Sequence, residues 1–179
     1  MANWNPKYEL DLIEIFDRAY SDEDQELQDK IKPLLRNSTI KTTYGQRVID
    51  EIVDRTQKNH IDKNGKSLGV YSKTYKDSLI FEIYKGNERE VNLTLTGEML
   101  SSLRNKPKGS MIIINLDGNN NRAKAQGHIT GRYGKKGRSN PRDFLGLPEK
   151  LEAKLLKETI KDYIRENKLV ETEAGFSNG

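Results

Sequence analysis

The chain has 179 residues, of which 34% are apolar and 32% are charged, and its formal net charge is +4. This length fits one domain with tails, and the polar composition favours a modest core with long exposed segments. The absence of cysteine excludes disulfides and thiolate metal sites. No apolar run approaches the roughly 18 residues that span a bilayer, and the N-terminus lacks the basic and apolar regions of a signal peptide. We therefore expect a soluble protein with no membrane partner.

The charge is distributed unevenly along the chain. Residues 9–29 hold nine acidic residues and one basic residue, Arg18. Residues 132–142 hold no acidic residue and five basic ones: Arg132, Lys135, Lys136, Arg138 and Arg142. Such opposite charges favour electrostatic pairing, either within the chain or between copies of it.

We expect residues 1–37 to form an acidic helical segment. Helical spacing of apolar side chains predicts a first helix over 8–20, on Leu12, Ile13, Phe16 and Tyr20. Ser21 is a suitable N-cap for a second helix, because acidic residues crowd the turn that follows and the helix dipole favours them there. Pro33 is expected to end or kink this second helix.

The core domain is predicted to span 38–167 and to begin with the clearest helical pattern, over 38–58. Ser38 or Thr39 can cap this helix. Its apolar stripe comprises Ile40, Tyr44, Val48, Ile49, Ile52 and Val53. Gly45 lies inside the helix at a cost of about 1 kcal/mol relative to alanine, which indicates a close contact between helix and sheet.

Four strands are expected in the core domain. The first two, 79–85 and 90–95, are joined by "GNER" as a hairpin, and a short helix capped by Thr96 follows them. The apolar run 110–116 is predicted to be the central strand, and 122–129 is predicted to pair back with it. Runs of strands, rather than strict alternation with helices, favour an α+β fold with an antiparallel sheet.

The sequence ends in a helix and a tail. Residues 147–167 carry one apolar face, with Pro148 near the first helical position. Residues 168–179 are polar, and we expect them to be disordered. The predicted fold is therefore α+β, with an antiparallel sheet packed against a long helix and a C-terminal helix, and with an extended basic loop.

Few residues carry recognisable chemistry. Neither His60 nor His128 has a partner at metal-ligand spacing. "DKNGKS" begins like a calcium loop at Asp62, but lysine stands at its fifth position, and serine replaces the glycine required at the sixth. No nucleophile motif is present, so we expect no catalytic residue, cofactor or metal.

The basic loop in "GHITGRYGKKGRSNPRDFLGL" (127–147) fails the spacing tests for a P-loop and for a dinucleotide fingerprint. "GRYG" and "GKKG" match the G-x-x-G clamp of KH domains, but neither flank reads as the helix that such a clamp requires. Three alternatives stay open: a solvated loop, a grip on nucleic-acid backbone, or an arm that reaches a neighbouring subunit. The candidate interface or DNA-facing residues are Arg132, Tyr133, Lys135, Lys136, Arg138, Arg142 and Phe144. Phe144, Leu145 and Leu147 are either the apolar anchor of this loop or ordinary core residues.

Four stretches occur in a characteristic order: "GKSLGVYSKTYKDSLIF" (65–81), "VNLTLTGEMLSSL" (91–103), "AKAQGHITG" (123–131) and "RDFLGL" (142–147). Together they resemble small neck and tail proteins of tailed bacteriophages, the group of virion-morphogenesis and tail-completion proteins. The resemblance covers roughly residues 38–165, so the acidic N-terminal segment lies outside it.

The resemblance implies a structural virion protein and not an enzyme. Such proteins form rings in the neck, as head–tail connectors, or at the head-proximal end of the tail, as tail terminators or completion proteins. The implied partners are further copies of the chain, other neck and tail proteins, and DNA that passes through the channel without sequence-specific contact. The implied location is the virion, assembled in the host cytoplasm. The alternative function is a basic nucleic-acid-binding module that uses the 131–142 loop.

Overall fold

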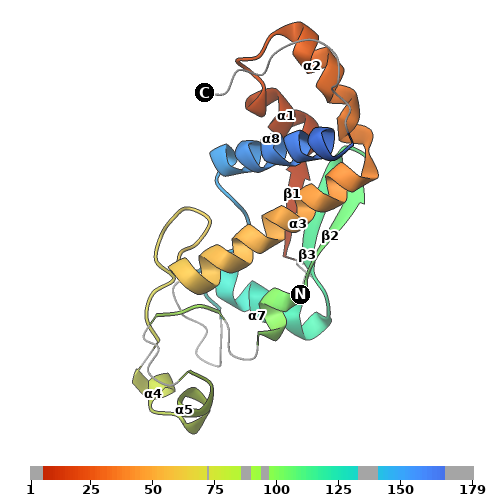
Figure 1. Ribbon diagram of the computed structural model, residues 1–179. Coiled ribbons are helices and arrows are strands. Elements are labelled where there is room, and N and C mark those ends of the chain that lie inside the picture. Colours follow the sequence, from red (N-terminus) through yellow and green to blue (C-terminus); the bar gives the residue numbers. More distant parts are fainter. Residues whose placement is uncertain (1–5, 72, 86–89, 94–96, 133–140, 168–179) are drawn as a thin grey trace.

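The computed structural model describes residues 6–71, 73–85, 90–93, 97–132 and 141–167 (Figure 1). Its centre is a three-stranded antiparallel sheet in the order β1-β3-β2. The strands are β1 (Lys7–Asp11), β2 (Leu103–Lys108) and β3 (Met111–Leu116). Ile112, Ile114 and Leu116 of β3 are fully buried and alternate with partly exposed neighbours, so one face of the sheet forms the core.

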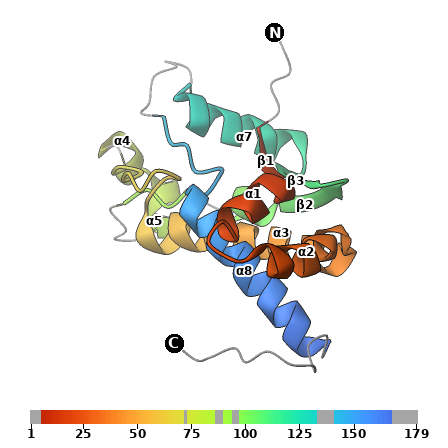
Figure 2. The same ribbon diagram turned by 90° about the horizontal axis from the view of Figure 1, so that it is seen from above.

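The core face is covered by two long helices, α3 (Ser38–Asp54) and α8 (Glu149–Glu166). α3 packs against β2, β3 and α8, and α1 (Leu12–Ala19) packs against α8. In Figure 2, α7 (Asn119–Thr130) lies on the far side of the sheet from α3 and α8. The prediction of an α+β fold, with an antiparallel sheet against a long helix and a C-terminal helix, is confirmed.

Shorter helices complete the chain. α2 (Gln25–Ile31) runs into a 3₁₀-helix, Lys32–Arg36, at Pro33, as predicted. A π-helical turn, Arg55–Asn59, extends α3. The remaining helices are α4 (Lys73–Lys76), α5 (Leu79–Lys85) and α6 (Glu98–Ser101).

The N-terminal prediction of one helix over 8–20 is wrong for its first turn. Residues 7–11 form β1, with Leu10 opposite Ile112 and Tyr8 opposite Ile114. The Asp11 side chain then accepts the Ile13 N–H and begins α1 at Leu12. The acidic segment therefore completes the sheet of the core domain through β1.

Two predicted strands are helices. Residues 79–85 form α5 and residues 122–129 lie within α7. A short apolar run such as "LIFEI" does not distinguish strand from helix by periodicity. "RAKAQ" in α7 consists of good helix formers, and this propensity was the better guide. Of the predicted strand 90–95, Glu90 bridges Val70, and residues 94–95 lie outside the described part of the chain.

Gly45 makes the predicted contact between helix and sheet. A Cβ atom placed on Gly45 would lie 2.8 Å from Asn105 Cβ in β2, closer than two carbon atoms can approach. Glycine at this position therefore allows α3 to lie directly on the edge strand.

We expect Gly45→Ala to lower the free energy of unfolding by about 1–3 kcal/mol, because overpacking at Asn105 exceeds the gain in helix propensity. Urea denaturation measures the change. Asn105→Gly removes the opposing Cβ, so Gly45→Ala is expected to be neutral or stabilising when made in that background. An equal loss in both backgrounds would contradict the contact.

Candidate assembly interface

The basic loop is only partly described. Arg132 is exposed, and its backbone N–H donates to the Gly127 carbonyl at 3.0 Å. Tyr133, Lys135, Lys136 and Arg138 lie outside the described residues. Their proposed role at an interface or on DNA stays a prediction.

One flank of the loop is a helix, contrary to the prediction. α7 is a helix that ends at Gly131, whose φ of 67° is the left-handed conformation of a helix C-cap. The first glycine of "GRYG" therefore terminates a helix. On the other side, the described residues 141–148 are not helical and α8 begins at Glu149, so the described part of this flank does not supply the second helix of a KH clamp.

Arg142 points into its own subunit. Its Nε donates to the Leu68 carbonyl at 2.8 Å, and its backbone N–H donates to the His128 carbonyl at 2.8 Å. One guanidinium nitrogen lies 3.4 Å from His128 Nδ1. Arg142 thus connects three of the four sequence stretches that carry the resemblance, 65–81, 123–131 and 142–147. Its guanidinium group makes these contacts within its own chain.

Phe144, Leu145 and Leu147 are buried, with exposed fractions of 0%, 6% and 7%. Of the two alternatives, an apolar anchor for the loop or ordinary core residues, the structure shows core residues. Because Phe144 is fully buried, its side chain cannot contact a neighbouring subunit. We refer to residues 142–147 as the RDFLGL segment.

A buried arginine holds the RDFLGL segment. Arg55, at the start of the π-helical turn, is 4% exposed, and its two terminal nitrogens donate to the carbonyls of Phe144 at 2.7 Å and Gly146 at 2.8 Å. Burial lowers the pKa of Arg55, and Glu51 and Asp62 oppose that shift. Charge-assisted hydrogen bonds of this kind stabilise more than neutral ones.

Tyr8 fixes the end of the same segment. Its hydroxyl accepts the Leu147 N–H and donates to Glu152 Oε1 of α8. Burial first, and then the hydrogen bond to Glu152, raise the pKa of Tyr8 above its ordinary value, so it stays a proton donor. Glu152 also accepts a hydrogen bond of 2.8 Å from Arg18 of α1.

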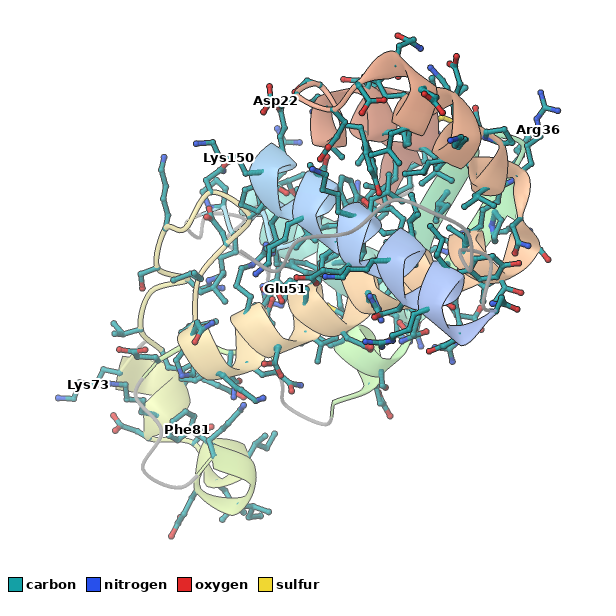
Figure 3. All side chains as sticks on the ribbon, turned by 45° about the horizontal axis from the view of Figure 1, so that its top comes forward. Asp22, Arg36, Glu51, Lys73, Phe81 and Lys150 are labelled. Carbon is teal, nitrogen blue, oxygen red and sulfur yellow. The ribbon has the colours of Figure 1, made fainter. Side chains whose placement is uncertain are left out.

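We expect Arg55→Met to lower the free energy of unfolding by about 3 kcal/mol, because the carbonyls of Phe144 and Gly146 lose a charged donor while buried. Urea denaturation measures this. The control is Arg36→Met, since Arg36 is exposed and extends into solvent in Figure 3. Substitutions at surface sites usually change the free energy of unfolding by less than about 0.5 kcal/mol. A change this small in both variants would contradict the role of Arg55.

His128 gives the fold a pH dependence. Burial, with a smaller contribution from Arg142, lowers the pKa of His128 from 6.5 to about 4. As the pH falls, His128 is protonated in the unfolded chain before it is protonated in the folded one. The contribution of neutral His128 to the free energy of unfolding is therefore complete above pH 6.5 and decreases progressively between pH 6.5 and about pH 4. Because His128 is only partly buried, we expect a loss of about 2 kcal/mol rather than the full value of the shift.

The measurement for His128 is urea denaturation of the wild type and of His128→Gln across that pH range. The glutamine variant is expected to lose about 2 kcal/mol less than the wild type over the range, since the other titrating groups are shared. Parallel curves for the two proteins would show that His128 titrates alike in the folded and unfolded states.

The acidic stretch 9–29 is used largely within the chain. Asp11 and Asp24 cap α1 and α2, and Glu23 pairs with Lys157 of α8 at 2.8 Å. The other six carboxylates each lie within hydrogen-bonding or ion-pairing distance of Lys7, Arg18, Ser21, Gln25, Lys30 or Lys32. The described residues thus show pairing within the chain, while pairing with the basic loop of another copy stays a prediction.

The described surface has an apolar projection that the sequence analysis did not identify. Four of the five large exposed apolar side chains among the described residues are Val70, Leu79, Ile80 and Ile83, with exposed fractions of 65%, 69%, 53% and 64%. They belong to the arm, which we define as Val70, Tyr71 and residues 73–85. Figure 1 shows its helices α4 and α5 projecting from the body.

The arm has a small core of its own. Phe81 is 3% exposed, and its ring lies 5.2 Å from that of Tyr71 and 5.3 Å from that of Tyr75, edge-on to both. These aromatic contacts hold α4 and α5 together. Because Phe81 is turned inward, the outer residues Leu79, Ile80 and Ile83 are left in water.

A surface groove lies between α3, α6 and β2. Its volume is about 460 Å³. It is lined by Ile49, Val53, Leu100 and Leu103, of which all but Val53 are buried, and by polar side chains that include Asp50 and Arg104. Arg104 donates to the carbonyls of Ser101 and Leu103, so its charge is directed to its own backbone.

The described residues contain no group of three or more His, Asp or Glu side chains placed to hold a metal ion. Asp62, the first residue of the rejected calcium loop, instead accepts the backbone N–H groups of Asn64 and Lys66 at 2.8 and 2.9 Å. This is a local turn. Among the helices described, none has the length and apolar character needed to cross a membrane.

No family model, no curated protein and no solved structure matches the chain. The relationship to phage neck and tail proteins therefore stays a prediction from the order of the sequence motifs.

Proposed function

We propose that the protein is a structural subunit of a tailed-phage virion. It forms a ring in the neck or at the head-proximal end of the tail, where it completes the tail or joins it to the head. Its partners are further copies of itself and other neck and tail proteins.

The observation that carries this proposal is the arm. A projecting pair of helices leaves Leu79, Ile80 and Ile83 in water, although Phe81 between them is buried. Contiguous exposed apolar side chains mark interaction surfaces, and their hydration is a cost that assembly removes.

The placement of the phage-like motifs supports the same function. "GKSLGVYSKTYKDSLIF" spans the base of the arm and most of the arm itself, and "RDFLGL" is held against that base through the hydrogen bond from Arg142 to Leu68. The sequence motifs that resemble those of phage ring proteins thus include most of the arm and the RDFLGL segment, which is hydrogen-bonded to its base.

Substitution of the arm tests the proposal. Leu79→Ser with Ile83→Ser is expected to leave the unfolding temperature within a few degrees of wild type, since both side chains are exposed. Loss of about 3 kcal/mol of interface burial is expected to raise the concentration needed for assembly about 100-fold. Sedimentation and electron microscopy measure assembly. The control is Ile13→Ser, which removes an exposed apolar side chain from α1, away from the arm.

Assembly of the wild-type chain also tests the proposal. A chain that stays monomeric at every concentration and is absent from purified virions would count against a ring subunit. Binding of duplex DNA by that monomer, with affinity that falls steeply as salt rises, would instead favour the basic nucleic-acid-binding module. Charge reversal at Lys135, Lys136 and Arg138 separates the contribution of the basic loop, because it abolishes DNA binding by a nucleic-acid module.

A further inference from the structure

We propose that the β2–β3 hairpin, residues 103–116, binds the phosphate backbone of duplex DNA through its outer face. The residues that make this contact are Arg104, Lys106 and Lys108 of β2, together with Lys41 of α3. The inference goes beyond the proposed ring function and does not require it. In the proposed ring it turns the hairpin toward DNA in the channel, and this consequence alone rests on the ring function.

The three basic side chains of β2 lie on one face of the sheet. Asn105, between two of them, points to the core side, where its Cβ atom faces Gly45 of α3. Since successive side chains of a strand point to opposite faces, Arg104, Lys106 and Lys108 share the outer face. All three are exposed. Their row is about 14 Å long, a length over which duplex DNA carries about eight phosphates.

Neither of the two segments that meet along β2 contains an acidic residue. Residues 36–49, which lead into α3 and form most of it, hold three basic residues, and residues 103–116 hold three more. α3 packs against β2, so these segments are neighbours in space. Among the described residues, only one of these basic side chains forms an ion pair, that of Arg47 with Asp162. The others carry positive charge that no carboxylate of the described chain pairs.

The carboxylates of the sheet belong to β1, on the far side of β3. Glu9 lies 2.6 Å from Lys7 Nζ, and Asp11 accepts the Ile13 N–H as the N-cap of α1. Both carboxylates are therefore used within the chain. The strand between them and the basic row presents neutral side chains on the outer face, those of Met111, Ile113 and Asn115.

The positive charge is greatest at the turn of the hairpin. Lys41 Nζ donates to the carbonyl of Gly109 at 2.7 Å, which places a further ammonium group beside Lys108. Residues 106–110 are all exposed, and α7 packs against α6 at the other end of β3, away from the turn (Figure 1). Three carboxylates line the hollows beside Arg104 at that other end, those of Asp50, Glu98 and Asp117. The turn is therefore where the field of the hairpin favours DNA most.

The chemistry of this face suits duplex DNA rather than single-stranded DNA. Proteins that bind single strands without sequence preference stack the bases on aromatic side chains. The outer positions of β2 and β3 carry arginine, lysine, methionine, isoleucine and asparagine, and no aromatic ring. Contacts from such a row to phosphates position a protein on DNA without reading its sequence. The expected ligand is therefore duplex DNA of any sequence.

Neutralisation of the turn tests the inference. Lys106→Gln with Lys108→Gln removes two phosphate contacts, and fluorescence anisotropy with a short labelled DNA duplex measures binding as the salt concentration is varied. The double variant is expected to lose at least about tenfold in affinity at about 0.1 M salt, and the plot of log K against log salt is expected to become less steep by about 2. Both residues are exposed, so the circular dichroism spectrum is expected to stay that of the wild type.

Two control variants separate the position of the charge from its amount. Lys150→Gln with Lys161→Gln removes the same charge from exposed sites of α8, and Figure 3 shows Lys150 on the opposite side of the body from Arg36. This control is expected to lose less than about threefold in affinity, because salt screens distant charges. Lys106→Arg with Lys108→Arg keeps the cations on the hairpin and is expected to bind DNA as the wild type does.

Each result decides the inference. Wild-type affinity of the glutamine hairpin variant for DNA would overturn it, as would an equal loss in the α8 control. The absence of DNA binding by the wild-type chain would also overturn it. Charge reversal at Lys135, Lys136 and Arg138 provides the comparison with the basic loop. Loss of DNA binding in that variant, with unchanged binding in the hairpin variant, would assign DNA to the loop instead.

Assembly measured on the same samples distinguishes this inference from the ring function. Reduced DNA affinity with wild-type assembly would support the hairpin contact and leave the ring standing, whereas reduced DNA affinity in a chain that never assembles would support the contact and count against the ring. Reduced assembly with unchanged DNA affinity would show a protein partner at the hairpin and overturn the inference. Aggregation with unchanged DNA affinity would overturn it too, since lysine on an edge strand such as β2 also opposes the addition of another strand.

Discussion

The buried guanidinium of Arg55 is the interaction on which the rest of this fold depends. Arg55 lies where α3 passes into a π-helical turn, and it donates to the carbonyls of Phe144 and Gly146. A buried charge is stabilising only when its hydrogen bonds are made, so this residue requires the RDFLGL segment to adopt one conformation. That conformation in turn sets where α8 begins.

The same segment connects the body to the arm. Arg142 donates to the carbonyl of Leu68, and the arm begins at Val70. A projecting element that is anchored by a buried network presents its outer side chains in a defined direction, which reduces the conformational entropy lost on binding. The hydrogen bonds of the buried Arg55 and the half-buried Arg142 therefore help to set the direction in which the exposed Leu79, Ile80 and Ile83 point.

The sequence predicted those elements whose burial pattern is regular. The stripe from Ile40 to Ile52 and the apolar run of β3 each bury one face, so periodicity identified them. β1 and β2 were missed because "KYELD" and "LRNKPK" are mostly polar, and their pairing with β3 is a tertiary effect. The charge pattern of the sequence predicted an assembly interface at the basic loop and gave no sign of the arm. Nothing in the local sequence distinguishes Arg55 from a solvated arginine, or shows that Phe81 is inward while Ile80 is outward.

The hydrogen bond from Tyr8 to Glu152 links the first strand to the last helix, and the residues of β1 pair with residues of β3 that lie 100 or more positions later in the chain. Contacts so distant in sequence make folding slow relative to local structures. During synthesis, β1 leaves the ribosome long before β3 and α8 exist, so the sheet cannot close until translation is nearly complete. The arm, built from local aromatic contacts, is able to form earlier. A nascent chain therefore exposes Leu79, Ile80 and Ile83 of the arm before the sheet has closed, and apolar surface exposed at that stage favours aggregation.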